Sequence, residues 1–106
     1  MGTRIFDADD EMLDFVMRSG GVFVCDIQRT TGDGTFTLQI SLDGGSNFVN
    51  YYNASGLLEQ RTLSSSTPHG RLEALGFTDT VFRVVSSATG DTPNFTAKAD
   101  RSVAAF

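Results

Sequence analysis

The segment Thr35–Phe48, with the sequence TFTLQISLDGGSNF, decides the fold of this chain. Every second residue in its first half is apolar: Phe36, Leu38, Ile40 and Leu42. This two-residue period is typical of a β-strand that buries one face and exposes the other. The following residues 43–45, Asp-Gly-Gly, suit a tight turn, and residues 47–53 supply a return strand. The segment therefore predicts a β-hairpin with one face in the core.

The same alternation extends outward along the chain. Residues 21–28, 80–87 and 94–101 alternate clearly, whereas residues 57–63 and 71–75 are weaker strand candidates. Together these segments predict six to eight short strands in an all-β domain. A sheet with one apolar face needs a cover, and a second sheet is the simplest one. We therefore expect an antiparallel β-sandwich or jelly-roll-like fold, with a small closed barrel as the competing topology.

Turn-forming residues separate the strand candidates. Two glycine-containing stretches, residues 30–34 and 89–93, are predicted to be turns that end one strand before the next begins. The inward positions of the alternating segments predict the core, which comprises Phe23, Ile27, Phe36, Leu38, Ile40, Phe82, Val84 and Phe95.

A length of 106 residues corresponds to one domain, which divides into three parts. Residues 1–19 are expected to form an N-terminal arm, either an extra strand or a short helix, residues 20–101 the β-sandwich body, and residues 102–106 a short C-terminal tail. The two ends carry apolar side chains that a small sandwich has little room to bury. We expect these side chains to contact partner chains: Ile5, Phe6, Met12, Phe15, Val103 and Phe106. The alternative is that the arm folds back as an extra strand on its own body.

Charge and hydropathy exclude several classes of partner. The net charge is −5 and the eight basic residues are scattered, so no basic stripe for nucleic acid is expected. No apolar run has the length of a signal peptide or a membrane span, so no membrane partner is expected. The single cysteine cannot form an internal disulfide and is compatible with a reducing cytoplasm.

No set of residues predicts catalysis, a cofactor or a metal site. His69 lies between Pro68 and Gly70 in a predicted surface turn, and Cys25 lies on an inward strand position as a core thiol. Residues 41–48 resemble the Asp-box hairpin of sialidase-type propellers, in which the motif is a structural turn. The chain holds one copy, whereas a propeller repeats the motif in each blade. We expect a non-enzymatic protein.

Three stretches together resemble small structural proteins of tailed bacteriophages. They are GGVF at residues 20–23, TFTLQISLDGGSNFV at residues 35–49 and FRVVSSATG at residues 82–90. Members of that family often carry Trp near the hairpin exit, where this chain has Phe48. The resemblance implies a virion component that is assembled in the host cytoplasm.

Within that family, the resemblance favours a capsid decoration (cement) protein. Such a protein would form a homo-oligomer, expected to be a trimer, and would bind the major capsid protein. A tail or fibre component is the first alternative. A carbohydrate-binding module that uses Tyr51 or Tyr52 as a sugar platform is the second, although these neighbours alternate and at most one of them points outward.

Overall fold

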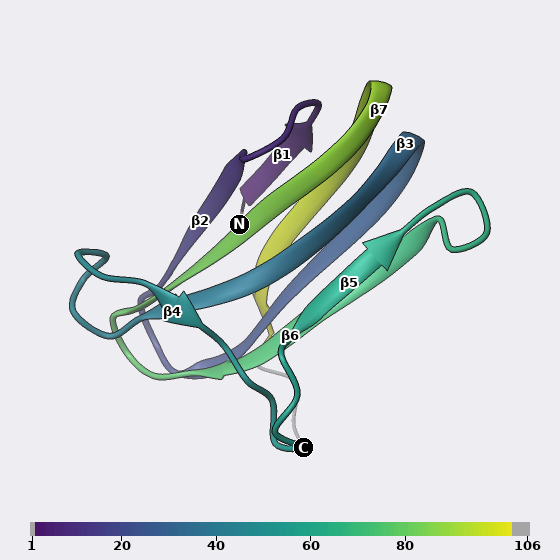
Figure 1. Cartoon of the computed structure of the whole chain (residues 1–106). Helices are drawn as coiled ribbons and strands as arrows, with labels where there is room; N and C mark the ends of the chain where they lie inside the picture. The colour runs from purple at the N-terminus through teal and green to yellow at the C-terminus, as the bar shows by residue number, and fades with distance from the viewer. Residues whose placement is uncertain (1, 103–106) are drawn as a thin grey trace.

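The computed structural model describes residues 2–102, with the backbone alone described at residues 89–91. This part of the chain folds into antiparallel β-strands and contains no helix (Figure 1). The strands are β1 (Gly2–Phe6), β2 (Met12–Met17), β3 (Gly21–Ser41), β4 (Val49–Asn50), β5 (Gln60–Leu63), β6 (His69–Gly76) and β7 (Thr80–Ser102).

The strands β3 and β7 are far longer than the sequence predicts. Strand structure continues through residues 30–34 and 89–93, which were both predicted to be turns that separate strands. The β3–β7 register shifts between Arg29 and Thr31 and again between Thr31 and Asp33, which marks β-bulges. Both strands bend sharply at this level (Figure 1). The chain therefore reverses direction where the sequence predicts it, but the strands bend instead of ending.

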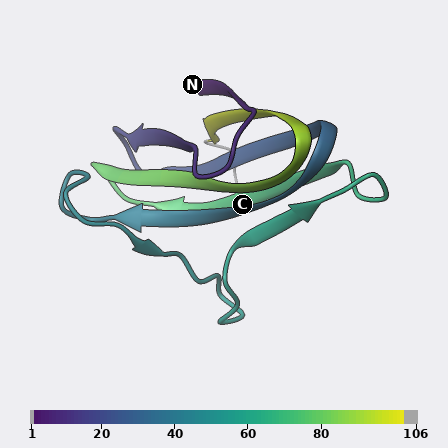
Figure 2. The same cartoon turned by 45° about the horizontal axis from the view of Figure 1, so that its top comes forward.

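The bends divide the fold into two layers. In the first layer the strand order is β1, the second half of β7, the first half of β3, and β6. In the second layer it is β2, the first half of β7, the second half of β3, and then β4 and β5 along one edge. This is a jelly-roll arrangement, and it confirms the predicted fold class. Because β3 and β7 pass through both layers, hydrogen bonding continues from one layer to the other, and the sheet curls round on itself (Figure 2).

Phenylalanine rings from the two layers pack against one another between them. The ring centroids of Phe23 in the first layer and Phe82 in the second lie 4.8 Å apart. Phe36 of the second layer lies 5.4 Å from Phe6 and 5.0 Å from Phe95, both of the first layer. Such aromatic pairs add specific geometry to a large burial of apolar area.

The predicted core is confirmed with one exception. Seven of the eight residues predicted to be in the core are fully buried, whereas Ile40 is half-buried. Ile40 is paired with Val49, which is itself 64% exposed, because the return strand β4 is only two residues long. The hairpin predicted around residues 43–45 is therefore present, but its return strand covers less of the core than expected.

The arm predicted for residues 1–19 consists, in its described part, of the two strands β1 and β2. Both pair with β7, so the arm extends the two layers, and the short helix considered for it does not occur in residues 2–19. The turn between the strands is held by Glu11, whose carboxylate accepts the backbone N–H groups of Asp7 and Ala8 at 2.7 and 3.0 Å. These bonds, the one from Asp7 foremost, lower the pKa of Glu11.

Candidate protein-docking surface

The residues that are predicted to contact partner chains differ in their burial. Phe6 is fully buried between the two layers of its own chain, so the prediction that it contacts a partner is wrong. The cause is the pairing of β1 with β7, which places Phe6 opposite the buried Phe95. Phe15 is half-buried, and its ring packs on Phe23 with centroids 5.6 Å apart. Phe15 therefore packs mainly against the core.

The other members of the predicted set lie outside the core or outside the described residues. Ile5 is 54% exposed on β1 and Met12 is 44% exposed on β2. Val103 and Phe106 lie beyond residue 102 and outside the described part of the chain. Ile5 and Met12 therefore stay candidates for a contact with a partner.

Met12 belongs to an outward surface of the second layer, which we call the β2 face. The β2 face consists of the outward residues of β2 and of the β7 residues opposite them: Met12, Asp14, Val16, Val81, Arg83 and Val85, of which Val81 is only 7% exposed. Met12 and Val16 are 44% and 43% exposed and stand on either side of Asp14. An apolar pair at outward positions of an edge strand favours a contact surface.

A fixed ion pair occupies the centre of the β2 face. The Nε and Nη2 atoms of Arg83 donate to the two carboxylate oxygens of Asp14 at 2.7 and 3.0 Å. The guanidinium carbon also lies 3.8 Å from the centroid of the Phe48 ring. The bonds to Asp14 raise the pKa of Arg83. The geometry orders all three side chains, so a partner would meet a surface that is already formed.

A second exposed apolar group lies at the end of β6 and was not predicted. Leu75 is 64% exposed and Phe77 is 73% exposed. The alternation of β6 turns Leu72 and Ala74 inward, so it could have marked Leu75 as an apolar residue at an outward position. The backbone N–H of Leu75 lies 3.4 Å from the hydroxyl of the half-buried Tyr51.

The aromatic sugar platform considered for Tyr51 and Tyr52 does not form as a pair. Tyr52 is 58% exposed, whereas Tyr51 is half-buried, and its ring packs edge-on against Phe82 with centroids 6.1 Å apart. One exposed aromatic ring remains at this place.

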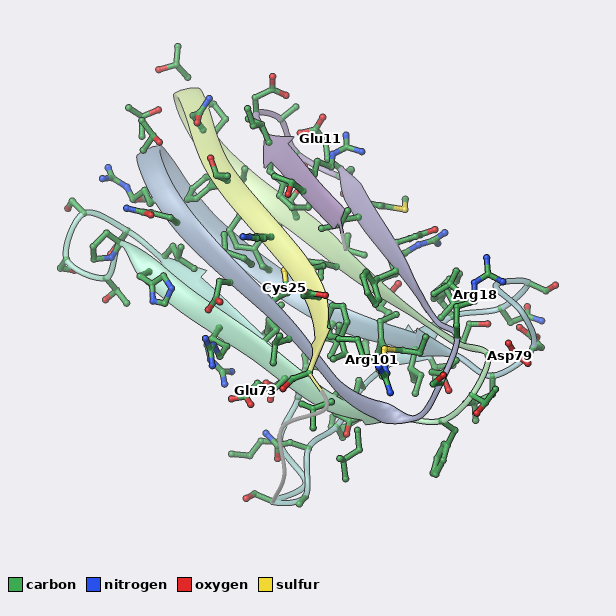
Figure 3. The ribbon with its side chains drawn as sticks, turned by 180° about the vertical axis from the view of Figure 1, so that it is seen from behind. Glu11, Arg18, Cys25, Glu73, Asp79 and Arg101 are labelled. Carbon is green, nitrogen blue, oxygen red and sulfur yellow. The ribbon has the colours of Figure 1, made fainter. Side chains whose placement is uncertain are left out.

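Cys25 and His69, the two residues whose chemistry could serve catalysis, differ in burial. Cys25 is fully buried between the layers (Figure 3), and this burial raises the pKa of its thiol to about 12. The imidazole of His69 is 60% exposed, and its Nε2 lies 3.5 Å from the carboxylate of Asp26. Among the side chains that the structure describes, no three from His, Cys, Asp or Glu gather as a set of metal ligands.

Asp43 holds the Asp-box-like turn together. Its Oδ1 accepts hydrogen bonds from the Ser41 hydroxyl and from the backbone N–H groups of Ser46 and Asn47, at 2.7, 3.1 and 2.9 Å. Its Oδ2 accepts from the Asn47 side chain at 2.8 Å. These bonds, chiefly that from Ser41, lower the pKa of Asp43 to about 2. The Asp43 carboxylate therefore stabilises the loop itself. This agrees with the structural-turn role of the Asp-box motif in sialidase-type propellers.

Comparison with known proteins supports the fold alone. No family model matches the chain, and no curated protein matches it. The crystal structure of the Yersinia pseudotuberculosis-derived mitogen is similar, with a TM-score of 0.60 over 99% of this chain and 88% of that one. The two sequences are 10% identical, so the similarity concerns the arrangement of strands. No helix in residues 2–102 is long and apolar enough to cross a membrane.

Proposed function

We propose that this chain is a non-enzymatic structural protein of a tailed-bacteriophage virion, a capsid decoration protein. In this role it forms a homotrimer and binds the shell of the major capsid protein, and the β2 face is the surface that docks. The resemblance of residues 20–23, 35–49 and 82–90 to small phage structural proteins supports the class. Jelly rolls are also a common architecture of viral capsid domains, which supports it by analogy.

The observation that carries the docking proposal is the composition of the β2 face. Two exposed apolar side chains, Met12 and Val16, flank the ordered Asp14–Arg83 ion pair. Exposed apolar side chains next to an ordered pair of charges favour a contact with another protein chain. On this surface the apolar residues would supply the buried area, and the ion pair would set the register of the complex.

Electron cryomicroscopy of the intact particle tests the station of the protein. We expect density for the chain in threefold clusters on the capsid shell. Density at the tail or in a fibre would instead support the alternative virion station. A particle that contains no copy of the chain would overturn the virion proposal.

A matched pair of variants tests the β2 face. Val16→Glu places a charge among the exposed apolar residues, while Ser65→Glu adds the same charge in the exposed turn between β5 and β6. We expect purified Ser65→Glu to bind particles that lack the chain as well as the natural protein does. Val16→Glu should bind at least tenfold more weakly, because burying an unpaired carboxylate is costly. Equal binding by both variants would exclude the β2 face as the docking surface.

A further inference from the structure

On the outward face of the second layer, polar side chains form hydrogen bonds with one another. Opposite residues on neighbouring strands share a face and meet across it. Three cross-strand pairs use this to form side-chain hydrogen bonds: Thr35 with Thr62 at 3.0 Å, Thr37 with Gln60 at 3.3 Å and Gln39 with Asn50 at 3.1 Å. Few donors or acceptors on these rows are left for a ligand.

The outward face of the first layer is different. One row runs Arg71, Asp26 and Lys98 across β6, β3 and β7, and the next runs His69, Gln28 and Thr96. Arg71 closes on Asp26 with hydrogen bonds of 2.8 and 3.1 Å. Within the described residues, the side chains of Lys98, Gln28 and Thr96 form no hydrogen bond or ion pair.

These unpaired groups line a hollow of about 220 Å³ on the surface of the first layer. It is bordered by Asp26, Ile27, Gln28, His69, Thr96 and Lys98. The hollow brings together the only lysine and the only histidine of the chain. Its volume lies below the range of pockets for drug-sized molecules, so it suits a ligand about the size of one sugar residue.

The charges around the hollow select for a ligand with one negative charge. The carboxylate of Asp26 is already neutralised by Arg71, which leaves the Lys98 ammonium as an unpaired cation beside it. Glu73 and Asp100 face outward in the next row and repel anions, and they repel a ligand with two negative charges about twice as strongly as one with a single charge. A carboxylate is therefore favoured over a phosphate that carries two charges.

The groups beside Lys98 are suited to hydroxyls. The amide of Gln28 and the hydroxyl of Thr96 can each donate and accept a hydrogen bond, as a sugar hydroxyl requires. Ile5 lies opposite Thr96 on β1 and is 54% exposed, so it offers an apolar contact at the rim. The C–H face of a sugar ring has matching apolar surface.

We propose that this hollow is a binding site for a sugar acid of the uronic acid class. The ligand carboxylate pairs with Lys98, and its hydroxyls bond to Gln28 and Thr96. The site lies on the first layer, whereas the β2 face lies on the second, so this site and the proposed docking surface can operate independently.

Nuclear magnetic resonance on the isotope-labelled natural chain tests the site directly. Because Lys98 is the only lysine, its Cε–Hε signal is unique, and the His69 imidazole signal is unique for the same reason. Titration with glucuronate should shift both signals together and reach saturation in the millimolar range. Glucose, which has the same ring with no carboxylate, should bind at least tenfold more weakly. Equal shifts with glucose would overturn the carboxylate recognition.

Two more ligands test whether Lys98 makes only a general ion contact and whether the hollow binds an acidic protein side chain instead. If acetate binds as tightly as glucuronate, Lys98 makes only a general ion contact, and the proposal is wrong. If N-acetyl-glutamate methylamide binds more tightly than glucuronate, the hollow takes an acidic protein side chain, and the sugar-acid assignment is wrong.

A matched pair of variants assigns the effect to Lys98. Lys98→Gln removes the cation of the hollow, whereas Arg18→Gln removes an exposed cation beyond the end of β2, near Asp79 (Figure 3). We expect Lys98→Gln to weaken glucuronate binding at least tenfold, measured on the His69 signal and the backbone amide of Thr96. Arg18→Gln should bind as the natural chain does. Equal losses in both variants would show a dependence on net charge alone and would overturn the site.

Discussion

The ring of Phe6 packs against the ring of Phe36 with centroids 5.4 Å apart and planes tilted by 58°. Phe6 comes from the N-terminal strand of the first layer and Phe36 from the centre of the second. Phe36 also packs on Phe95, so three rings from three strands fill one end of the core. The first strand is thus an integral part of the fold, and its removal would open the core.

Truncation of Phe6 should destabilise the isolated chain. Phe6→Ala should lower the free energy of unfolding by about 3–5 kcal/mol, because it leaves a cavity between the layers. The neighbouring Ile5 is 54% exposed, so Ile5→Ala should change stability by no more than about 0.5 kcal/mol. Urea unfolding followed by circular dichroism measures both. Similar small losses in the two variants would mean that Phe6 is not a core residue in solution.

Gly76 allows β6 to approach the core rings. A Cβ built at this position would lie 2.9 Å from Cε2 of Phe82 and 3.2 Å from Met17. Phe82 is fully buried and stacked on Phe23, so it has little room to move. Gly76→Ala should therefore destabilise the chain by about 1–3 kcal/mol through overpacking.

Gly20 provides the control for this substitution. A Cβ at Gly20 would lie 3.5 Å from the nearest atom, the carbonyl oxygen of Gly76, which is an ordinary contact. Gly20→Ala should leave the thermal unfolding temperature unchanged or slightly raised, because alanine restricts the unfolded chain. If Gly76→Ala behaves in the same way, the close packing described for Phe82 is absent in solution.

The local alternation of apolar residues was enough to predict the inward face of the long strands. Phe36 and Leu38 belong to the alternating segment 35–42 and are fully buried, whereas Leu42, just beyond the end of β3, is 74% exposed. The bends were not predictable in the same way, because residues 30–34 and 89–93 have turn-forming sequences. Whether such residues end a strand or form a bulge depends on the partner strand, and the long β3–β7 pairing holds the strand structure through them.

The surface was harder to predict than the core. The sequence predicts Phe6 at an interface because a short segment does not show which of its faces will be covered. The pairing of β1 with β7 decides that, and it places Phe6 opposite Phe95. The exposed position of Leu75 is not predicted because residues 71–75 show only a weak strand pattern, and Phe77 lies beyond that segment, in the turn before β7. The hollow beside Lys98 depends on register across β6, β3 and β7, which no local pattern in the sequence contains.

Asp43 should make the stability of the chain depend on pH in the acidic range. Its pKa is about 2 in the folded chain, whereas an unfolded aspartate has a pKa of about 3.9. A depressed folded pKa contributes stability that is fully present above the unfolded value and is lost as pH falls through the folded value. The loss should therefore occur between about pH 4 and pH 2.

The variant Asp43→Asn should show a smaller decrease of the unfolding temperature over this pH range than the natural chain. Asp33→Asn removes the same charge from a carboxylate that accepts no hydrogen bond among the described residues, and it serves as the control. Thermal unfolding at several pH values between 2 and 5 measures the difference. Parallel curves for the natural chain and Asp43→Asn would contradict the role of Asp43 in the folded loop.

Cys25 should be unreactive in the folded chain and should report on its opening. Burial, with a smaller contribution from the charge of Asp26, raises the thiol pKa to about 12, and only a thiolate attacks a disulfide reagent. At pH 8 the reaction with Ellman's reagent should therefore follow transient unfolding, because the side chain is fully buried. Phe6→Ala should then accelerate the reaction roughly a hundredfold or more, since each 1.4 kcal/mol changes the unfolded population tenfold. Rapid labelling of the natural chain, at a rate that Phe6→Ala leaves unchanged, would show that the thiol is accessible without opening the core.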